Sequence, residues 1–342
     1  MPMKFLASLL KVFDPARPAE TAGAVTRATG ADRRSTVGVG PGPVQTQPVS
    51  GRSDVNVDRR FTASLLGIGS LRAAQAEAAE RRVVEQLEQL GRDGRNSNLV
   101  PRLPVVLPRL ISLVRRDDVT PQELADSLAP DPALVGELVR VANSPRYRRP
   151  RDIADLQEAV VVVGQRGLTE LVIRASMRPI FSAHRGRFSR IAGSKVWDVT
   201  ERCAHACAHL RDDPTDRFHA YLAGMAVNIG LIAALRVLDA DYPEQRSPDS
   251  EAFHDALNRA SAKLSARIAR QWDFPSAVCD AIRRRARPQP EDRGEDLSWA
   301  LRAADRAAKW HLLSPGLDAG ELDILDESAR RCYEELERSL AG

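Results

Sequence analysis

Repeated signals for the start and the end of short helices dominate the middle of this sequence. Residues 120–123 (TPQE) combine a hydroxyl that can cap free amides, a proline at the first helical position and a glutamate at the third. Residues 131–132 (DP) begin the next helix, and residues 143–145 (NSP) end it, because proline disfavours helical backbone in the residue before it. A chain divided into short helices with separate stops predicts a compact multi-helix bundle.

The apolar residues agree with an all-α fold. Aromatic residues make up only 5% of the chain, whereas the hydrophobic fraction is 43%, so the core must be built from Ala, Leu, Val and Ile. Alanine and leucine favour helices, while sheets are richer in aromatic and β-branched residues. We expect a buried helical stripe over residues 103–114, a helix from 155 closed by Gly164, and helices near 196–210, 217–239, 250–272, 275–287, 296–313 and 318–340.

The chain divides into five segments. Residues 1–13 form a short amphipathic helix that orders against a membrane surface, a partner or its own core, with a frayed terminus as the alternative. Residues 14–57 are rich in Pro, Gly, Ser and Thr and predict a disordered tether. A connecting helix is expected at residues 58–95, loosened near Gly67 and Gly69, followed by the main domain at residues 96–290. Residues 291–342 form a helical extension that packs back on the bundle through a stripe of Leu322, Leu325, Ala329, Tyr333 and Leu336.

Three stretches of the main domain together resemble a known family. They are LPRLISLV at residues 107–114, the stretch from Thr120 to Tyr147 that contains DPAL and ANS, and DLQEAVVVVGQRGLTELV at residues 155–172. In this order they are similar to the HDOD family, and a weaker match continues through Trp197 and residues 272–275 (WDFP). The resemblance covers roughly residues 100 to 290. It implies an all-helical fold related to the HD phosphohydrolases, whose enzymes gather histidine and aspartate metal ligands from several helices.

The resemblance also implies where such ligands would stand, and none of those positions holds a histidine. Valine offers no lone pair, and an arginine adds positive charge where a cation should bind. We therefore expect no metal, no cofactor and no hydrolytic activity. The positions are Val199, Val227, Asn228, Ser261, Arg285 and Ala286.

One cluster, CAHACAH at residues 203–209, has the composition of a zinc site. At about 100° per residue, however, Cys203 and Cys207 share one face of a helix, while His205 and His209 point nearly the opposite way. Four such ligands cannot converge on one ion, so we expect the cysteines to be small buried residues. The sequence also contains no glycine-rich phosphate loop and no nucleophile elbow.

Polar residues near two helix ends are the candidates for an interaction surface. Short side chains before a proline can cap a helix end, and arginines near a helix C-terminus can complement its dipole, so a purely structural role stays open beside recognition. The formal net charge of +4 permits a basic patch without requiring nucleic acid. The candidates are Asn143, Ser144, Arg146, Tyr147, Arg148, Arg149, Arg283, Arg284 and Arg287.

Four irregularly spaced cysteines and the lack of a secretory signal predict reduced thiols and a cytoplasmic protein. No apolar run approaches the ~20 residues of a membrane-spanning helix, which leaves peripheral contact through residues 3–13.

We expect a non-catalytic regulatory protein of bacterial signal transduction that binds a protein partner or a small anionic signal. The alternatives are a divergent metal-dependent phosphohydrolase acting on nucleotides or cyclic dinucleotides, and a nucleic-acid-binding protein that uses the arginine clusters.

Overall fold

Every regular element in the described part of the chain is a helix, as the sequence predicts; the only β-type pairing there is an isolated bridge between Arg72 and Ser250. The computed structural model describes residues 52–93, 98–103, 119–130, 132–144, 156–182, 186–243, 245–286, 296–316 and 321–341, with single positions at 107, 108, 112, 113, 116, 147 and 153. The predicted N-terminal helix (1–13) and most of the tether (14–57) lie outside these residues, as do residues 104–106, 109–111 and 114 of the predicted stripe at 103–114.

Two helices replace the single connecting helix expected at residues 58–95. Helix α2 covers Arg52–Leu65 and helix α3 covers Ala78–Asp93, and the segment between them is not helical. Gly67 lies there with φ of 71°, a backbone conformation that suits glycine and ends the helix where loosening was expected. Helix α2 also begins inside the predicted tether, because the stripe of Val57, Phe61 and Leu65 is buried and orders the polar turn before it.

A small apolar cluster joins helices α5 (Pro121–Leu128), α6 (Pro132–Ala142) and the first half of α7 (Leu156–Ser182). The predicted capping box is present, since Thr120 accepts from the backbone of Glu123 and the Glu123 carboxylate accepts from the backbone of Thr120. Gly164 closes the first helical stretch, as predicted. It forms a kink with φ of 73° and ψ of 163°, beyond which a further helical stretch continues to Ser182.

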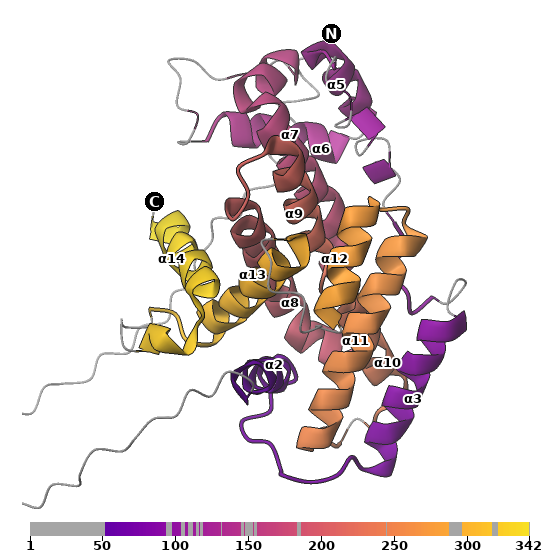
Figure 1. Ribbon diagram of the computed structural model, residues 1–342. Helices are drawn as coiled ribbons and strands as arrows, with labels where there is room; N and C mark the ends of the chain where they lie inside the picture. Colours follow the sequence, from indigo (N-terminus) through magenta and orange to yellow (C-terminus); the bar gives the residue numbers. More distant parts are fainter. Residues whose placement is uncertain are drawn as a thin grey trace, which may run out of the picture. The chain divides into compact units, whose positions relative to one another are not determined.

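The larger core is built by the remaining helices, which Figure 1 shows crossing one another in several layers. Helix α8 packs against α9, α10, α13 and α14, and α11 packs against α2, α3, α10 and α12. Four of the five residues in the predicted stripe of the C-terminal extension are buried, with Leu325, Ala329, Tyr333 and Leu336 at most 5% exposed, and the fifth, Leu322, is partly buried. The helices are α8 (Arg187–His209), α9 (Pro214–Ala226), α10 (Ile229–Asp241), α11 (Glu251–Gln271), α12 (Ser276–Ala286), α13 (Leu297–Leu313), the short 3-10 helix η3 (Glu321–Ile324) and α14 (Glu327–Ala341).

The helix expected at residues 217–239 is interrupted, and the interruption shapes the pocket described below. Helix α9 ends at Ala226 and α10 begins at Ile229, with Asn228 at φ of −102° and ψ of 7° between them. Two glycines allow neighbouring helices to approach this junction closely. A Cβ on Gly224 would collide with the backbone of Ala204 in α8, and one on Gly230 would collide with the carbonyl oxygen of Ser261 in α11.

Helix α2 is held against α11 by polar contacts as well as by its apolar stripe. The Arg59 guanidinium donates to both carboxylate oxygens of Asp255, at 2.5 and 2.6 Å, and to Glu251 at 2.9 Å. Thr62 lies 2.8 Å from Nδ1 of the buried His254. These contacts place the adjacent residues 57, 58 and 61 of α2 in the wall of the pocket.

One apolar stretch, residues 215–241, is long and hydrophobic enough to cross a membrane, but 94% of its most apolar window is buried inside the protein. It coincides with α9 and α10, so its hydropathy is accounted for by burial in the core.

Candidate functional site

Four of the six positions at which the resemblance implies metal ligands line one pocket of about 430 Å³. Val227 and Asn228 reach it from the α9–α10 junction, Ser261 from α11 and Arg285 from α12. Val199 is fully buried on α8 and does not line this pocket, and the side chain of Ala286 lies outside the described residues. Residues separated by almost sixty positions in the sequence are therefore brought to one place.

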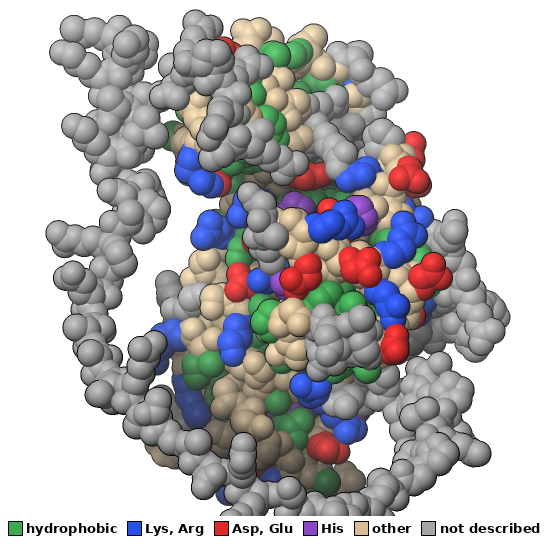
Figure 2. Space-filling model, turned by 90° about the vertical axis from the view of Figure 1, so that its left-hand side faces the viewer, with side chains coloured by type: hydrophobic (Ala, Val, Ile, Leu, Met, Phe, Trp, Pro, Cys, Tyr) green, Lys and Arg blue, Asp and Glu red, His purple; other side chains and the backbone are tan. Residues whose placement is uncertain are grey.

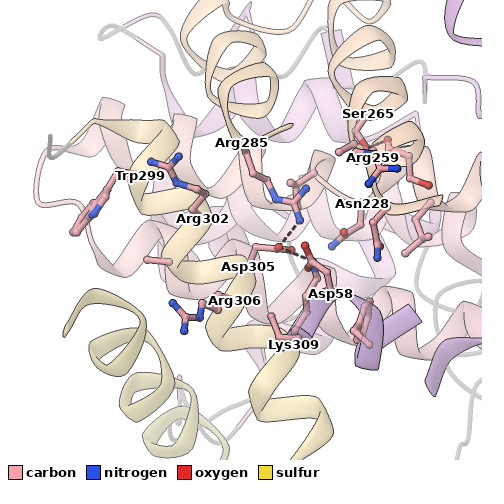
Figure 3. Close-up of a pocket in the computed structure, with 18 of the residues that line it drawn as sticks. Asp58, Asn228, Arg259, Ser265, Arg285, Trp299, Arg302, Asp305, Arg306 and Lys309 are labelled. Carbon is pink, nitrogen blue, oxygen red and sulfur yellow. Dashed lines mark hydrogen bonds and ion pairs between the residues drawn. The ribbon is translucent and has the colours of Figure 1, made fainter. Parts of the chain in front are cut away.

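A charged network crosses the middle of the pocket, as Figure 3 shows. Asp305 of α13 forms ion pairs with Arg285 of α12 and, at 2.7 Å, with Lys309 one turn further along its own helix. Lys309 also contacts Asp58 of α2 at 2.5 Å. Two cations and two carboxylates from three helices thus neutralise one another inside the protein.

Three of the four side chains in this network are largely buried, and burial affects the pKa of Asp305 and of Arg285. The side chains of Asp305 and Lys309 are 6% and 4% exposed, and that of Arg285 is 13% exposed. Burial alone would raise the pKa of Asp305, but the positive charges of Arg285 and Lys309 hold it below its usual range. Burial likewise disfavours charged Arg285, and Asp305 and Asp58 outweigh it so that the pKa of Arg285 is raised. Arg285 and Asp305 are consequently held together as a charged pair.

These side chains do not fit a divalent metal. Val227 has no donor atom, Asn228 carries no charge and donates to Thr200 at 3.3 Å, and Arg285 places a guanidinium in the pocket. Asp305, which could otherwise serve as a ligand, is already bound to two cations. Among the residues that the structure describes, no group of three or more His, Cys, Asp or Glu side chains is placed to hold a metal ion.

Comparison with known proteins agrees with the sequence resemblance. The HDOD domain model matches residues 100–288, which is more than half of the 342 residues. The chain belongs to the HDOD domain family. Its fold is that of an HDOD protein of unknown function from Geobacter sulfurreducens, with a TM-score of 0.54 and 20% identity over 75% of this chain and 96% of that one.

Two further proteins are similar to this HDOD chain. A Shewanella amazonensis SB2B protein, provisionally named a metal-dependent phosphohydrolase, has a TM-score of 0.53 and 19% identity over 77% of this chain and 99% of that one. An uncharacterized protein from Treponema pallidum (strain Nichols) is 24% identical over 201 residues. That match spans 54% of this chain but only 37% of the Treponema protein. At these identities the solved structures establish the fold alone.

The CAHACAH cluster of the HDOD chain lies on α8 with the orientation predicted for it. Cys203 and Cys207 are fully buried, whereas His205 is exposed and His209 is half-buried on the opposite face. Burial raises the pKa of the Cys207 thiol to about 12 and also raises that of Cys203. The cysteines are core residues, and the two histidines face a groove.

Two residues of the predicted interaction surface line that groove. Ser144 and Tyr147 line a pocket of about 380 Å³, which shares Arg174 and His205 with an adjoining pocket of about 730 Å³ that extends to α14. Figure 2 shows acidic, basic and histidine side chains intermixed over the middle of one face of the molecule. Asn143 has a structural contact, because its amide donates to the carbonyl of residue 153 at 2.9 Å and accepts from the amide of that residue at 2.7 Å.

The arginines of α12 that the structure describes are each paired with a carboxylate. On α12, Arg283 pairs with Asp280 at 2.8 Å and Arg284 pairs with Asp296 at 3.1 Å. The next arginine, Arg285, is buried in the ion network. The remaining candidates, Arg146, Arg148, Arg149 and Arg287, lie outside the described residues.

Sequence reasoning missed the charged partners of Arg285. Asp58 was assigned to a connecting helix, and Asp305 and Lys309 to a terminal extension without a role in the site. One local signal could have found the last two: an Asp–Lys pair with i, i+4 spacing stands in an alanine-rich stretch, RAADRAAK, whose alanines are buried. No local signal links Asp58 to them, because that contact spans 251 positions.

Proposed function

We propose that this HDOD protein is a non-catalytic regulatory protein of signal transduction, which recognises a ligand or a protein partner without metal chemistry. The observation that carries the proposal is the ion network in the pocket. Where a related enzyme would hold a cation, this chain carries Arg285 and Lys309, whose charges are balanced by Asp305 and Asp58. A divalent ion at the same place would have to displace both cations.

Two features of the site support binding in place of hydrolysis. Activation of water at neutral pH needs a metal or a general base with an adapted pKa. The lining residue Asp305 is instead held as a charged carboxylate by two cations, and no histidine lines the pocket. A rigid helical frame with a neutralised interior can recognise shape and hydrogen bonding, but it lacks a group that would polarise a nucleophile.

Metal analysis of the purified full-length protein, combined with phosphodiesterase assays on nucleotides and cyclic dinucleotides, tests this function. After dialysis against Fe²⁺, Mn²⁺ and Zn²⁺ followed by buffer exchange, we expect far less than one metal ion per chain and no turnover above background. Stoichiometric metal with turnover would contradict the proposal, provided that both are lost in Asp58→Asn and retained in Asp280→Asn, whose carboxylate lies outside the pocket.

A further inference from the structure

The pocket has the dimensions and the mixed lining of a small-molecule site. Its volume of about 430 Å³ falls within the roughly 300–1,000 Å³ range that ligand pockets in proteins occupy. Apolar side chains from α2, α10 and α13, including Phe61, Leu231 and Trp299, line it beside the charged groups. A ligand there would contact an apolar wall and a polar floor together.

Two buried polar atoms on this floor have no hydrogen-bond partner within the described part of the chain. They are Oγ of Ser261 and Oδ1 of Asp305, in residues that are 5% and 4% exposed. Buried polar atoms in proteins are nearly always hydrogen-bonded, so a molecule bound in the pocket can supply the partner that each atom lacks among the described residues. Because the Asp305 carboxylate is charged and its other oxygen holds Arg285 and Lys309, the partner for Oδ1 must be an N–H or O–H donor.

The net charge of the side chains that line the pocket also favours a ligand with an anionic group. Five basic and three acidic side chains line it, which leaves a net charge of +2. The interior network contributes nothing to this excess, since its two cations and two carboxylates cancel. The excess comes from Arg259, Arg302 and Arg306 against the single acidic Asp326. Figure 3 shows Arg302 and Arg306 on α13 and Arg259 on the other side of the network, so the positive groups flank the neutral interior.

We propose that this pocket binds a phosphate monoester whose uncharged part carries hydrogen-bond donors, the class to which purine nucleoside monophosphates belong. The phosphate lies against Arg259 on one side of the network, and the N–H donors of the base or the hydroxyls of the sugar satisfy Asp305 and Ser261. Trp299 and Phe61 supply apolar surface for the base. This inference rests on the proposed function, because it treats the pocket as a recognition site that leaves its ligand intact.

Calorimetric titration of the full-length protein with three probes tests the site: guanosine monophosphate, guanosine and inorganic phosphate. We expect the nucleotide to bind at least tenfold more tightly than either of the others, because each of those can make only part of the contacts. Arg259→Gln and Ser261→Ala should each weaken nucleotide binding about five- to tenfold, in line with loss of one hydrogen bond or one charged contact. Arg259 is exposed, so its replacement leaves the fold intact.

The control is Lys263→Gln, which removes an exposed positive charge one turn from Arg259 on the same helix without touching the pocket. Its nucleotide affinity should equal that of the wild type. If guanosine monophosphate fails to bind, or binds the wild type and both pocket variants equally, the ligand assignment is wrong, whereas a metal-free and inactive protein would still support the proposed function. If the nucleotide binds and is then hydrolysed to inorganic phosphate, the site stands and the non-catalytic function is wrong.

Discussion

Asp305 is the residue on which the charged network depends. It contacts Arg285 and Lys309, and Lys309 also forms an ion pair with a second carboxylate, that of Asp58. A surface carboxylate in a comparable pair, Asp280 with Arg283, remains hydrated, with side chains 55% and 53% exposed. The same substitution at the two positions therefore separates the effect of burial from the effect of pairing.

We expect Asp305→Asn to lower the free energy of unfolding by about 3–5 kcal/mol, because it leaves two buried cations with one carboxylate. Asp280→Asn should cost less than about 1 kcal/mol, as is usual for exposed pairs. Urea unfolding followed by circular dichroism measures both values. Equal losses in the two variants would show that the network contributes no more than a surface ion pair.

At the scale of helices, local patterns predicted most of the elements correctly. The capping box at Thr120 and the stripe through Leu325 and Tyr333 depend on neighbours within one or two turns, and both are present. The break after α2 was predicted in part, because Gly67 and Gly69 signal it locally. The break at 227–228 was missed, because the sequence there continues a helical pattern and the close approach of α8 and α11 is not a local signal. The family resemblance placed Arg285 at the site. Its partners on α2 and α13 were missed because they lie outside the residues that the resemblance covers.

Close helix packing near the α9–α10 junction leads to a prediction about two glycines in helices. Gly230→Ala should destabilise the protein by about 1–3 kcal/mol, because the new methyl group would meet the backbone of α11. Gly136→Ala on α6 has open space around its Cβ and should stabilise by about 0.5–1 kcal/mol through helix propensity. Thermal unfolding of the two variants should therefore shift in opposite directions, and a shift in the same direction would contradict the packing described for Gly230.

For the whole molecule, two buried histidines link helices that are distant in sequence. His254 of α11 is fully buried between Thr62 of α2 and the carbonyl of Pro248, to which its Nε2 donates at 2.9 Å. His311 of α13 is 4% exposed and lies 3.1 Å from Glu337 of α14. Burial is the main cause that lowers the pKa of each imidazole, with the charge of Arg202 adding to the effect at His311.

Global stability should consequently fall as the pH drops. The unfolded chain binds protons at histidine near pH 6.5, whereas the folded protein resists them, so the contribution of both residues is complete above pH 6.5 and is lost as the pH falls through the lowered folded-state values. Each full proton taken up on unfolding changes stability by about 1.4 kcal/mol per pH unit.

Unfolding in urea at pH values from 7.5 to 5 measures this slope. It should be smaller in His254→Gln than in the wild type, while His205→Gln, which removes an exposed ring on α8, should leave it unchanged. An unchanged slope in the double variant of His254 and His311 would exclude them as its source.

Helix α2 connects the buried ion network to the N-terminal end of the described residues. Asp58 supplies one of the two negative charges of the buried network, and it belongs to this helix. Displacement of α2 would remove the Asp58 carboxylate from Lys309 and leave an uncompensated positive charge in the network. A movement of α2 would therefore change the charge balance around a residue that lies 251 positions further along the chain.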